Sequence, residues 1–510
     1  MKTKLSRREF LKLTGLASLG IVTPQFLTQP GTAPAVPGGK NVLVIVFDAF
    51  SAYHLALNGY ARETMPNLKR LAEKAVVYHN HFSGGNYTTP GTASLLTGTQ
   101  PWSHRAFEGG SRVAENVARR NIFEAFEGYY RMAYSHNRYA ITFLEQFLSS
   151  TDNLIPYENL ILEGKDLVSK LFHKDEDIAS VAWIRALKPA EGPTYSLFLS
   201  RADSFSQASQ ERKMAAIRKD FPRGLPYTKQ DNHFLLEQAI DYVAAEIGKA
   251  PQPFLGYFHF LPPHRPYNTR REFFEAFDKD GYVLPKKPEH IFSGGTSYEL
   301  LAKWCNWYDE YLLYVDAEFA RLYDQLEQAG ILANTWLVLT SDHGELFEHG
   351  VVGHSTPLLN QPVIRVPLVI FEPGRSTRLD IDAPTSAIDV LPTLLHLTSQ
   401  PIPDWAEGTL LPPYAPNGQP QRDLFVIDSR NSRQAAPITE ASITIIRDGY
   451  KLIWYTGYKE LKNSGDLIEL YDLNNDPQEL NDFSGTQTAL AEELLNAIKT
   501  RLKEVNQPFQ

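Results

Sequence analysis

Runs of consecutive apolar residues alternate along the chain with segments in which apolar positions recur every three or four residues. The clearest apolar runs are residues 41–47, 335–340 and 364–371, which are rich in Val, Ile and Leu. Such runs predict strands that are buried on both faces. The segments with helical spacing are residues 64–75, 230–250 and 301–328. This alternation predicts an α/β fold with a doubly wound, mostly parallel sheet.

Further apolar runs predict more strands, and the pattern changes near residue 401. In the first 400 residues these runs are 76–82, 131–135, 194–200 and 253–261. Beyond residue 401 short strands with little helix between them are predicted over residues 424–427, 442–447, 451–455 and 470–472, followed by a helix over 487–505. We therefore expect one large domain over residues 40–400 and a smaller C-terminal α+β subdomain with an antiparallel sheet over residues 401–510.

The first 35 residues have the pattern of a targeting segment. Residues 6–12 read Ser-Arg-Arg-Glu-Phe-Leu-Lys, which matches every specified position of the twin-arginine export motif S-R-R-x-F-L-K. A short, weakly apolar run follows, and residues 32–35 supply a small-residue cleavage site. This predicts a twin-arginine signal peptide over residues 1–35, recognised by the export machinery, and a periplasmic or otherwise extracytoplasmic location. The alternative is an amphipathic basic N-terminal helix.

Composition narrows the class of protein. The 510 residues include 43% hydrophobic residues, enough to bury a large core, and the apolar run near the N-terminus is too short to span a bilayer. We therefore expect no transmembrane anchor in the mature chain. With 50 Lys and Arg against 59 Asp and Glu, and no dense basic stripe, nucleic acid is not an expected partner. The single cysteine, Cys305, excludes an intrachain disulfide.

Two acids follow apolar strands at the points where the strands end. Asp48 comes directly after residues 41–47, and Asp342 and His343 come directly after residues 335–340. Parallel sheets place their active sites at this edge, so we expect these side chains to meet there. An acid at such a junction also suits a turn, and Asp48 alone would not distinguish the two interpretations.

A hydroxyl-rich turn before a predicted helix supplies the remaining chemistry. Thr88 lies in the segment Asn86-Tyr-Thr-Thr-Pro-Gly-Thr, and the start of the following helix favours an anion. Two carboxylates, an imidazole and this hydroxyl around one divalent cation would lower the pKa of the hydroxyl and turn it into a nucleophile. We therefore predict Asp48, Thr88, Asp342 and His343 as metal ligands, with Thr88 also as the catalytic nucleophile.

Two histidines in loops are further catalytic candidates. His264 lies between prolines in Pro262-Pro263-His264-Arg265-Pro266, directly after a predicted strand, and His354 follows Gly353 downstream of the predicted metal site. A histidine held between prolines is pre-organised, although a packed or exposed loop histidine is the alternative. We expect both rings to bind substrate oxygens or to protonate the leaving group. Asn86, two residues before Thr88, is a candidate donor to a substrate oxygen.

Together these segments resemble the sulfatase branch of the alkaline phosphatase superfamily. The matching segments are residues 44–48, the nucleophile motif over 88–98, the loop over 258–267, the Ser-Asp-His-Gly-Glu stretch over 341–345, and residues 353–354, 365–370, 387–395 and 469–477. The resemblance implies an alkaline-phosphatase-like fold, a catalytic domain over residues 40–400, one divalent metal ion and hydrolysis of an ester. It also places His136 near the position of a substrate-binding lysine.

The chain departs from the sulfatase pattern at the nucleophile. Sulfatases have Cys or Ser there, which is oxidised to formylglycine, whereas this chain has Thr88, and Gly91 and Thr92 replace the Ser and Arg of the motif. With threonine at this position, the motif is similar to that of nucleotide pyrophosphatases and phosphodiesterases. We therefore predict hydrolysis of phosphate or phosphonate esters through a covalent Thr88 intermediate. The alternatives are a sulfuric ester hydrolase without formylglycine, a phosphoglycerol or phosphoethanolamine transferase, and an inactive glycan-binding relative.

The residue types do not decide the identity of the metal ion. Sulfatases often carry a second metal-binding aspartate where this chain has Ala49, which would make the site looser. His264 and His354 are alternative ligands for a second ion, but no extra acid motif accompanies them, so one metal ion is the expected number. Ca²⁺ suits the resemblance to sulfatases, whereas Zn²⁺ or Mn²⁺ suits an imidazole combined with a threonine. The expected substrate is a small-molecule, glycan-derived or lipid-derived ester.

Overall fold

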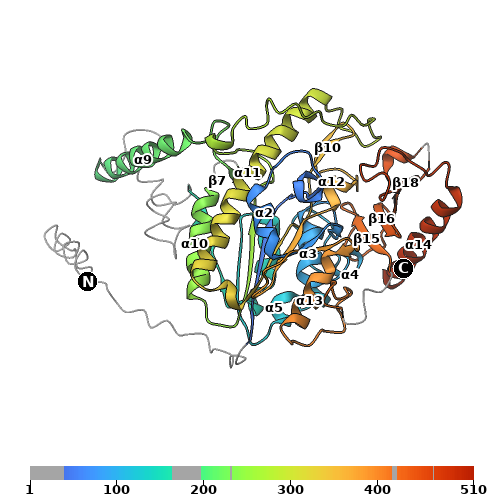
Figure 1. Cartoon of the computed structure of the whole chain (residues 1–510), viewed down its shortest axis with the longest axis horizontal. Helices are drawn as coiled ribbons and strands as arrows, with labels where there is room; N and C mark the ends of the chain where they lie inside the picture. The colour runs from blue at the N-terminus through green and yellow to red at the C-terminus, as the bar shows by residue number, and fades with distance from the viewer. Residues whose placement is uncertain (1–38, 163–196, 230–231, 416–421, 463–464, 510) are drawn as a thin grey trace, which may run out of the picture. The chain divides into compact units, whose positions relative to one another are not determined.

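A mixed, mostly parallel sheet of eight strands forms the centre of the protein (Figure 1). The computed structural model describes residues 39–162, 197–229, 232–415, 422–462 and 465–509. The strand order is β13 (Leu379–Ile381), β2 (Val76–Tyr78), β12 (Leu368–Phe371), β9 (Thr335–Thr340), β1 (Asn41–Phe47), β8 (Phe254–Phe260), β4 (Tyr130–Ser135) and β5 (Asn153–Leu154). Only β12 runs antiparallel to its neighbours in this sheet. The predicted signal peptide lies outside the described residues.

Helices cover both faces of the sheet, which confirms the doubly wound α/β fold. Alternate residues of β1 divide between two cores: Leu43 and Ile45 pack in one, Val42 and Val44 in the other. The first core includes residues of α2 (Pro66–Leu71), α10 (Leu236–Lys249) and α11 (Tyr298–Gln328). The second includes residues of α3 (Thr88–Thr97), α5 (Ile122–Ala125), α6 (Arg138–Gln146) and α13 (Val390–Leu397). A strand that is apolar on both faces is needed wherever helices cover both sides.

The C-terminal part forms the predicted antiparallel subdomain. Its sheet has the order β15 (Leu424–Asp428), β16 (Ala441–Arg447), β17 (Tyr450–Thr456) and β18 (Leu467–Asp472), with every neighbouring pair antiparallel. Helix α14 (Thr488–Asn506) packs its apolar side against β16 and β17. The division of the chain at residues 35 and 400 stays a prediction.

Some predicted elements differ from the structure. Residues 197–200, predicted as part of a strand, begin helix α9 (Leu197–Arg218), and residues 194–196 lie outside the described part. A short apolar run does not distinguish strand from helix, and here residues that favour helix follow without a turn. The predicted strand over 76–82 divides into β2 and β3 (His81–Phe82), which pairs with β14 (Thr385–Ser386). Helix α12 (Gln361–Ile364) precedes β12.

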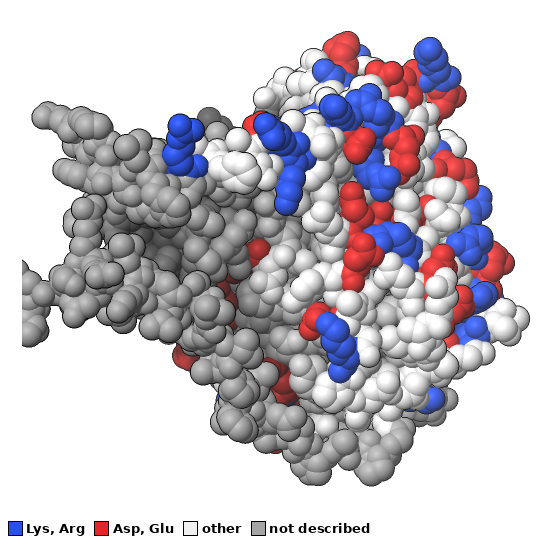
Figure 2. Space-filling model, turned by 90° about the vertical axis from the view of Figure 1, so that its left-hand side faces the viewer, with Lys and Arg blue, Asp and Glu red and all other residues white. Residues whose placement is uncertain are grey.

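Acidic and basic side chains are mixed on the surface. On the face shown in Figure 2, Lys and Arg side chains lie interspersed with Asp and Glu over the described residues. Among the helices of the described residues, none combines the length and the apolar character that crossing a bilayer requires.

A buried ion pair joins the C-terminal sheet to the main domain. The side chains of Lys451 on β17 and Glu479 are fully buried, and the Lys451 ammonium lies 2.5 Å from the Glu479 carboxylate. The Lys451 ammonium also donates to the carbonyl of Leu359, and Glu479 accepts a hydrogen bond of 2.8 Å from the backbone amide of Gln361. Both charges therefore depend on partners across this junction.

Glu479→Gln is expected to lower the free energy of unfolding by about 3–5 kcal/mol, because it leaves the Lys451 ammonium buried without an anionic partner. The midpoint and slope of urea unfolding would measure the loss. A matched control is Glu504→Gln, since the Glu504 carboxylate is about half exposed and lies 3.2 Å from Arg501. The control is expected to cost about 1 kcal/mol or less. Equal losses in the two variants would contradict a special role for the buried pair.

Candidate metal and ester-binding site

The two predicted acid positions meet at the C-terminal edge of the central sheet. Strands β1 and β9 are parallel neighbours, with Val46 opposite Thr340, so the residues that follow them emerge side by side. The Nε2 atom of His343 lies 3.4 Å from Oδ1 of Asp48 and 3.7 Å from Oδ2 of Asp342. All three side chains are buried. Asp48 after β1, and Asp342 and His343 after β9, therefore form one compact centre.

Thr88 joins this centre from the opposite side. It is the first residue of α3, and its Oγ1 lies 3.4 Å from Nε2 of His343. Helix α3 approaches closely because Gly91 has no side chain, and a Cβ atom there would lie 2.0 Å from the carbonyl oxygen of Asp342. The next residue, Thr92, donates to Oδ2 of Asp342 at 3.3 Å. The structure thus brings all four predicted ligands together.

The His343 ring is oriented for ligation. Its Nδ1 lies 2.8 Å from the carbonyl oxygen of Gly344, so Nδ1 carries the proton in the neutral ring and Nε2 presents its lone pair to the centre. Burial opposes a charged ring, but the carboxylates of Asp342 and Asp48 outweigh it and raise the pKa of His343 to about 9. A divalent cation would replace this proton, since both stabilise the same two carboxylates.

The electrostatics of the carboxylates fit a divalent cation. Burial alone would raise the pKa of Asp48, but the surrounding histidines outweigh it and hold the pKa well below its usual value. Burial and the neighbouring Asp48 raise the pKa of Asp342. Moreover, Oδ1 of Asp48 is buried without a hydrogen-bond partner. Two buried carboxylates, one with an oxygen that accepts no hydrogen bond, favour a positive charge between them, so this set of residues fits a metal ion.

A cavity of about 430 Å³ opens onto Thr88. His264 and His354 both line it, with ring centroids 4.9 Å apart. The Nδ1 of His264 lies 2.7 Å from the carbonyl oxygen of Arg265, and the Nδ1 of His354 lies 2.8 Å from the buried carboxylate of Glu345. Burial lowers the pKa of His354 to about 4 in the free site. Both rings therefore lie where a substrate held against Thr88 would meet them.

The two predicted substrate-binding residues differ in their placement. The side-chain amide of Asn86 donates to the carbonyls of Thr356 at 2.7 Å and Leu358 at 3.0 Å, so it holds the loop after His354 and does not line the cavity. Its predicted contact with the ester stays a prediction, and the contacts of its amide nitrogen in this structure are with the backbone. His136 lines the cavity, with its ring stacked on Phe234 at a centroid distance of 4.3 Å, and its binding role stays a prediction.

Two residues at the centre were not predicted from the sequence. Asn137 donates to Oγ1 of Thr88 at 3.1 Å and to the Asp48 carboxylate. Its side-chain oxygen also caps helix α6 by accepting a hydrogen bond from the backbone amide of Tyr139. In the sequence Asn137 therefore has the pattern of a helix start, which does not indicate its contact with Thr88. His259 places Nε2 at 3.3 Å from Oδ2 of Asp48. It lies inside the aromatic strand β8, where a lone histidine in an otherwise apolar run was the only signal.

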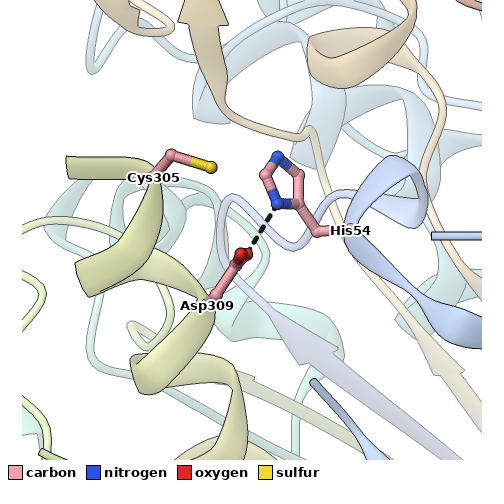
Figure 3. Close-up of side chains that lie close together, drawn as sticks. All are labelled: His54, Cys305 and Asp309. Carbon is pink, nitrogen blue, oxygen red and sulfur yellow. Dashed lines mark hydrogen bonds and ion pairs between the residues drawn. The ribbon is translucent and has the colours of Figure 1, made fainter. Parts of the chain in front are cut away.

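A second cluster of possible ligands lies between residues 52–62 and α11 (Figure 3). His54, Cys305 and Asp309 are all buried, with Cys305 and Asp309 one turn apart on α11 and facing His54. The Asp309 carboxylate already accepts hydrogen bonds from His54, Tyr60 and Arg62, the last at 2.8 Å. A cation there would face the Arg62 guanidinium, so we assign the cluster a structural role. Burial raises the pKa of the Cys305 thiol well above its usual value.

Comparisons with known proteins agree with this geometry. The sulfatase family model matches residues 40–148 and 186–400, and the model for the C-terminal part of N-sulphoglucosamine sulphohydrolase matches residues 348–508. The multifunctional alkaline phosphatase superfamily protein PehA of Trinickia caryophylli is 24% identical over 498 residues, which cover 88% of this chain and 91% of PehA.

Solved structures share the fold over nearly the whole chain. The phosphonate monoester hydrolase of Agrobacterium radiobacter has a TM-score of 0.64 at 20% identity, covering 91% of this chain and 95% of its own. A protein solved in complex with its substrate D-glucosamine-2-N,6-O-disulfate has a TM-score of 0.63 at 16% identity, covering 92% and 99%. Because the sulfatase family model spans most of the chain, the chain belongs to the sulfatase family of the alkaline phosphatase superfamily and is an ester hydrolase.

Proposed function

We propose that this protein hydrolyses phosphate or phosphonate esters through a covalent intermediate on Thr88. One observation carries the proposal: the Thr88 hydroxyl lies at the start of α3, within 3.4 Å of His343, and opens onto the cavity lined by His264 and His354. The nucleophile and two imidazoles therefore line one cavity, and the nucleophile also contacts the metal-binding centre. This arrangement suits nucleophilic attack on a charged ester.

In the first step the Oγ1 atom of Thr88 attacks phosphorus and the bond from phosphorus to the leaving oxygen breaks. The Thr88 proton passes to solvent water as the bond forms. Asn137 holds the Oγ1 atom by donating to it at 3.1 Å, which fixes the direction of attack. The start of α3 also directs backbone N–H groups at the nucleophile, and these favour the negative charge that develops there.

The leaving oxygen needs a proton, which His264 or His354 can supply from Nε2. Each ring has its Nδ1 engaged, so each is held with Nε2 available to the ester. An anionic ester beside His354 would raise the pKa of the ring from its low value and favour the protonated form. In the second step water attacks phosphorus, the bond from phosphorus to Oγ1 of Thr88 breaks, and Oγ1 takes up the proton that the attacking water releases.

A divalent cation held by Asp48, Asp342, His343 and Thr88 would lower the pKa of the Thr88 hydroxyl and neutralise charge on the ester oxygens. The two carboxylates, and the Asp48 oxygen that accepts no hydrogen bond, support this assignment. Thr88 itself supports phosphorus over sulfur. A threonine has one hydroxyl and cannot become an aldehyde hydrate, so it lacks the second hydroxyl with which formylglycine expels sulfate.

The relatives and the N-terminal motif extend the proposal. The phosphonate monoester hydrolase that shares the fold supports a monoester of a phosphonate as one substrate class. The twin-arginine motif at residues 6–12 supports export of the folded, metal-loaded enzyme to the periplasm or another extracytoplasmic space.

A panel of substrates with one leaving group tests the proposal. The metal-loaded protein is expected to cleave at least one of the nitrophenyl esters of phosphate, phosphate diester and phosphonate with a kcat/KM about 100-fold or more above that for nitrophenyl sulfate. Because the four esters share their leaving group, the comparison isolates the group that is transferred. Robust sulfate release without turnover of any phosphorus ester would overturn the proposal.

A further inference from the structure

We infer that His259 is a further ligand of the metal ion and that the resulting donor set selects a transition metal such as Zn²⁺ over Ca²⁺. The inference rests on the metal centre of the proposed function and assigns one more residue to it. Among the buried histidines, His259 stands out because its imidazole faces the two carboxylates from the end of strand β8, opposite the side from which β9 delivers His343.

His259 and His343 have matching positions relative to the two acids. The Nε2 atom of His259 lies 3.3 Å from Oδ2 of Asp48, and that of His343 lies 3.4 Å from Oδ1 of the same carboxylate. Each Nε2 lies 3.7 Å from one shared atom, Oδ2 of Asp342. Donor atoms around a tetrahedral zinc ion, with bonds of about 2.0–2.2 Å, are about 3.3–3.6 Å apart. The two distances to Asp48 fall within this range and the two to Asp342 lie just above it, so both rings are close to the spacing that ligands require.

The His259 ring is also held in the tautomer that ligation needs. Its Nδ1 lies 3.2 Å from the hydroxyl of Tyr257 two residues earlier on the same strand. With the proton on Nδ1 donated to this hydroxyl, Nε2 carries a free lone pair directed at the carboxylates. Ligating histidines commonly donate their other N–H to such a partner, which fixes the orientation of the ring. Both side chains are fully buried, so neither reorients toward solvent.

Two imidazoles change the metal that the centre prefers. Ca²⁺ takes six to eight oxygen ligands, whereas nitrogen donors favour Zn²⁺ and its neighbours in the first transition row. With His259 included, the protein offers two imidazole nitrogens, two carboxylates and the Thr88 hydroxyl. The four ligands predicted from the sequence do not distinguish Ca²⁺ from Zn²⁺. A second imidazole makes the donor set favour Zn²⁺.

X-ray absorption of the Zn²⁺-loaded wild-type protein tests the inference without any variant. The expected spectrum contains the scattering of two imidazoles per zinc ion. One imidazole per zinc would overturn the inference. Competition with a chromophoric chelator then gives the affinities for Zn²⁺ and Ca²⁺, and tighter binding of Ca²⁺ would also overturn it.

Variants separate ligation from packing. His259→Gln is expected to weaken Zn²⁺ binding by about 100-fold or more, and Tyr257→Phe by about 10-fold. His104→Gln is the matched control, because His104 is equally buried but its Nε2 bonds to Ser94 at 3.1 Å. The control is expected to leave the affinity unchanged. If His259→Gln binds Zn²⁺ as wild type does, His259 is only an ionic partner of the carboxylates.

These measurements involve no substrate, so the two proposals can fail separately. Thr88-dependent cleavage of phosphorus esters by a Ca²⁺ enzyme would refute the role of His259 and leave the proposed function intact. A zinc ion held by two imidazoles in a protein that cleaves only sulfate esters would refute the proposed function and support the role of His259.

Discussion

Thr88→Ala is expected to lower kcat for the best phosphorus ester by about 10³-fold or more while changing KM little. The variant removes the only atom that forms the covalent intermediate, whereas the cavity lined by His264 and His354 still binds the ester. Thr88→Ser keeps a hydroxyl at the start of α3 and is expected to retain measurable turnover. Steady-state kinetics of the three proteins, each with its metal content determined, would measure the difference.

The control for this variant is Thr89→Ala. Thr89 is the next residue of the same helix turn, and its side chain accepts a hydrogen bond of 3.0 Å from the backbone amide of Gly110, away from the metal centre.

Rapid acid quenching during turnover should trap one phosphoryl group on the peptide that contains Thr88, and none in Thr88→Ala. Wild-type kcat in Thr88→Ala would exclude the threonine as nucleophile.

Loss of the metal is expected to have a comparable effect on turnover. Dialysis against a strong chelator, or the substitution Asp342→Asn, should lower kcat/KM by roughly 10³-fold, because the nucleophile is no longer activated and the ester charge no longer neutralised. Adding the metal back should restore the dialysed wild-type protein and not the variant. The exposed acid Asp382 provides the control, Asp382→Asn.

The same variant separates a catalytic from a structural role for Asp342. In the metal-free protein Asp48 and Asp342 repel each other, and this repulsion contributes to the raised pKa of Asp342. Metal-free Asp342→Asn is therefore expected to unfold at the same temperature as the metal-free wild type or at a higher one. A clear fall in this temperature, together with full activity in metal, would show that Asp342 serves the fold and not the reaction.

The part of the site that could be predicted follows from the sheet. The acids after β1 and β9 were identifiable because an acid at the end of an apolar strand departs from the pattern around it, and the parallel pairing of these strands brings Asp48 to His343. The Thr88 turn was identifiable from its many hydroxyl groups and from the small residues that open α3. The doubly wound fold followed from the alternation of apolar runs and helical spacing.

The missing part depends on side chains that serve two purposes. Asn137 has the sequence signal of a helix cap, and nothing local indicates that its amide nitrogen reaches Thr88. His259 lies within an aromatic strand, where only the pairing of β8 with β1 shows that it faces the acids. Asn86 shows the opposite case, because its proximity to Thr88 in sequence predicts proximity to the ester, whereas the structure places its amide nitrogen against the carbonyl of Thr356.

The close approach of α3 at Gly91 has a consequence for protein engineering and for divergence within the family. Grafting the formylglycine motif onto this enzyme would require Ser in place of Gly91 and Arg in place of Thr92. Any side chain at Gly91 would bring its Cβ within 2.0 Å of a backbone carbonyl that cannot rotate away, since that carbonyl belongs to Asp342 itself. A change to the formylglycine motif therefore requires a wider spacing between helix α3 and the sheet edge, as well as a different nucleophile.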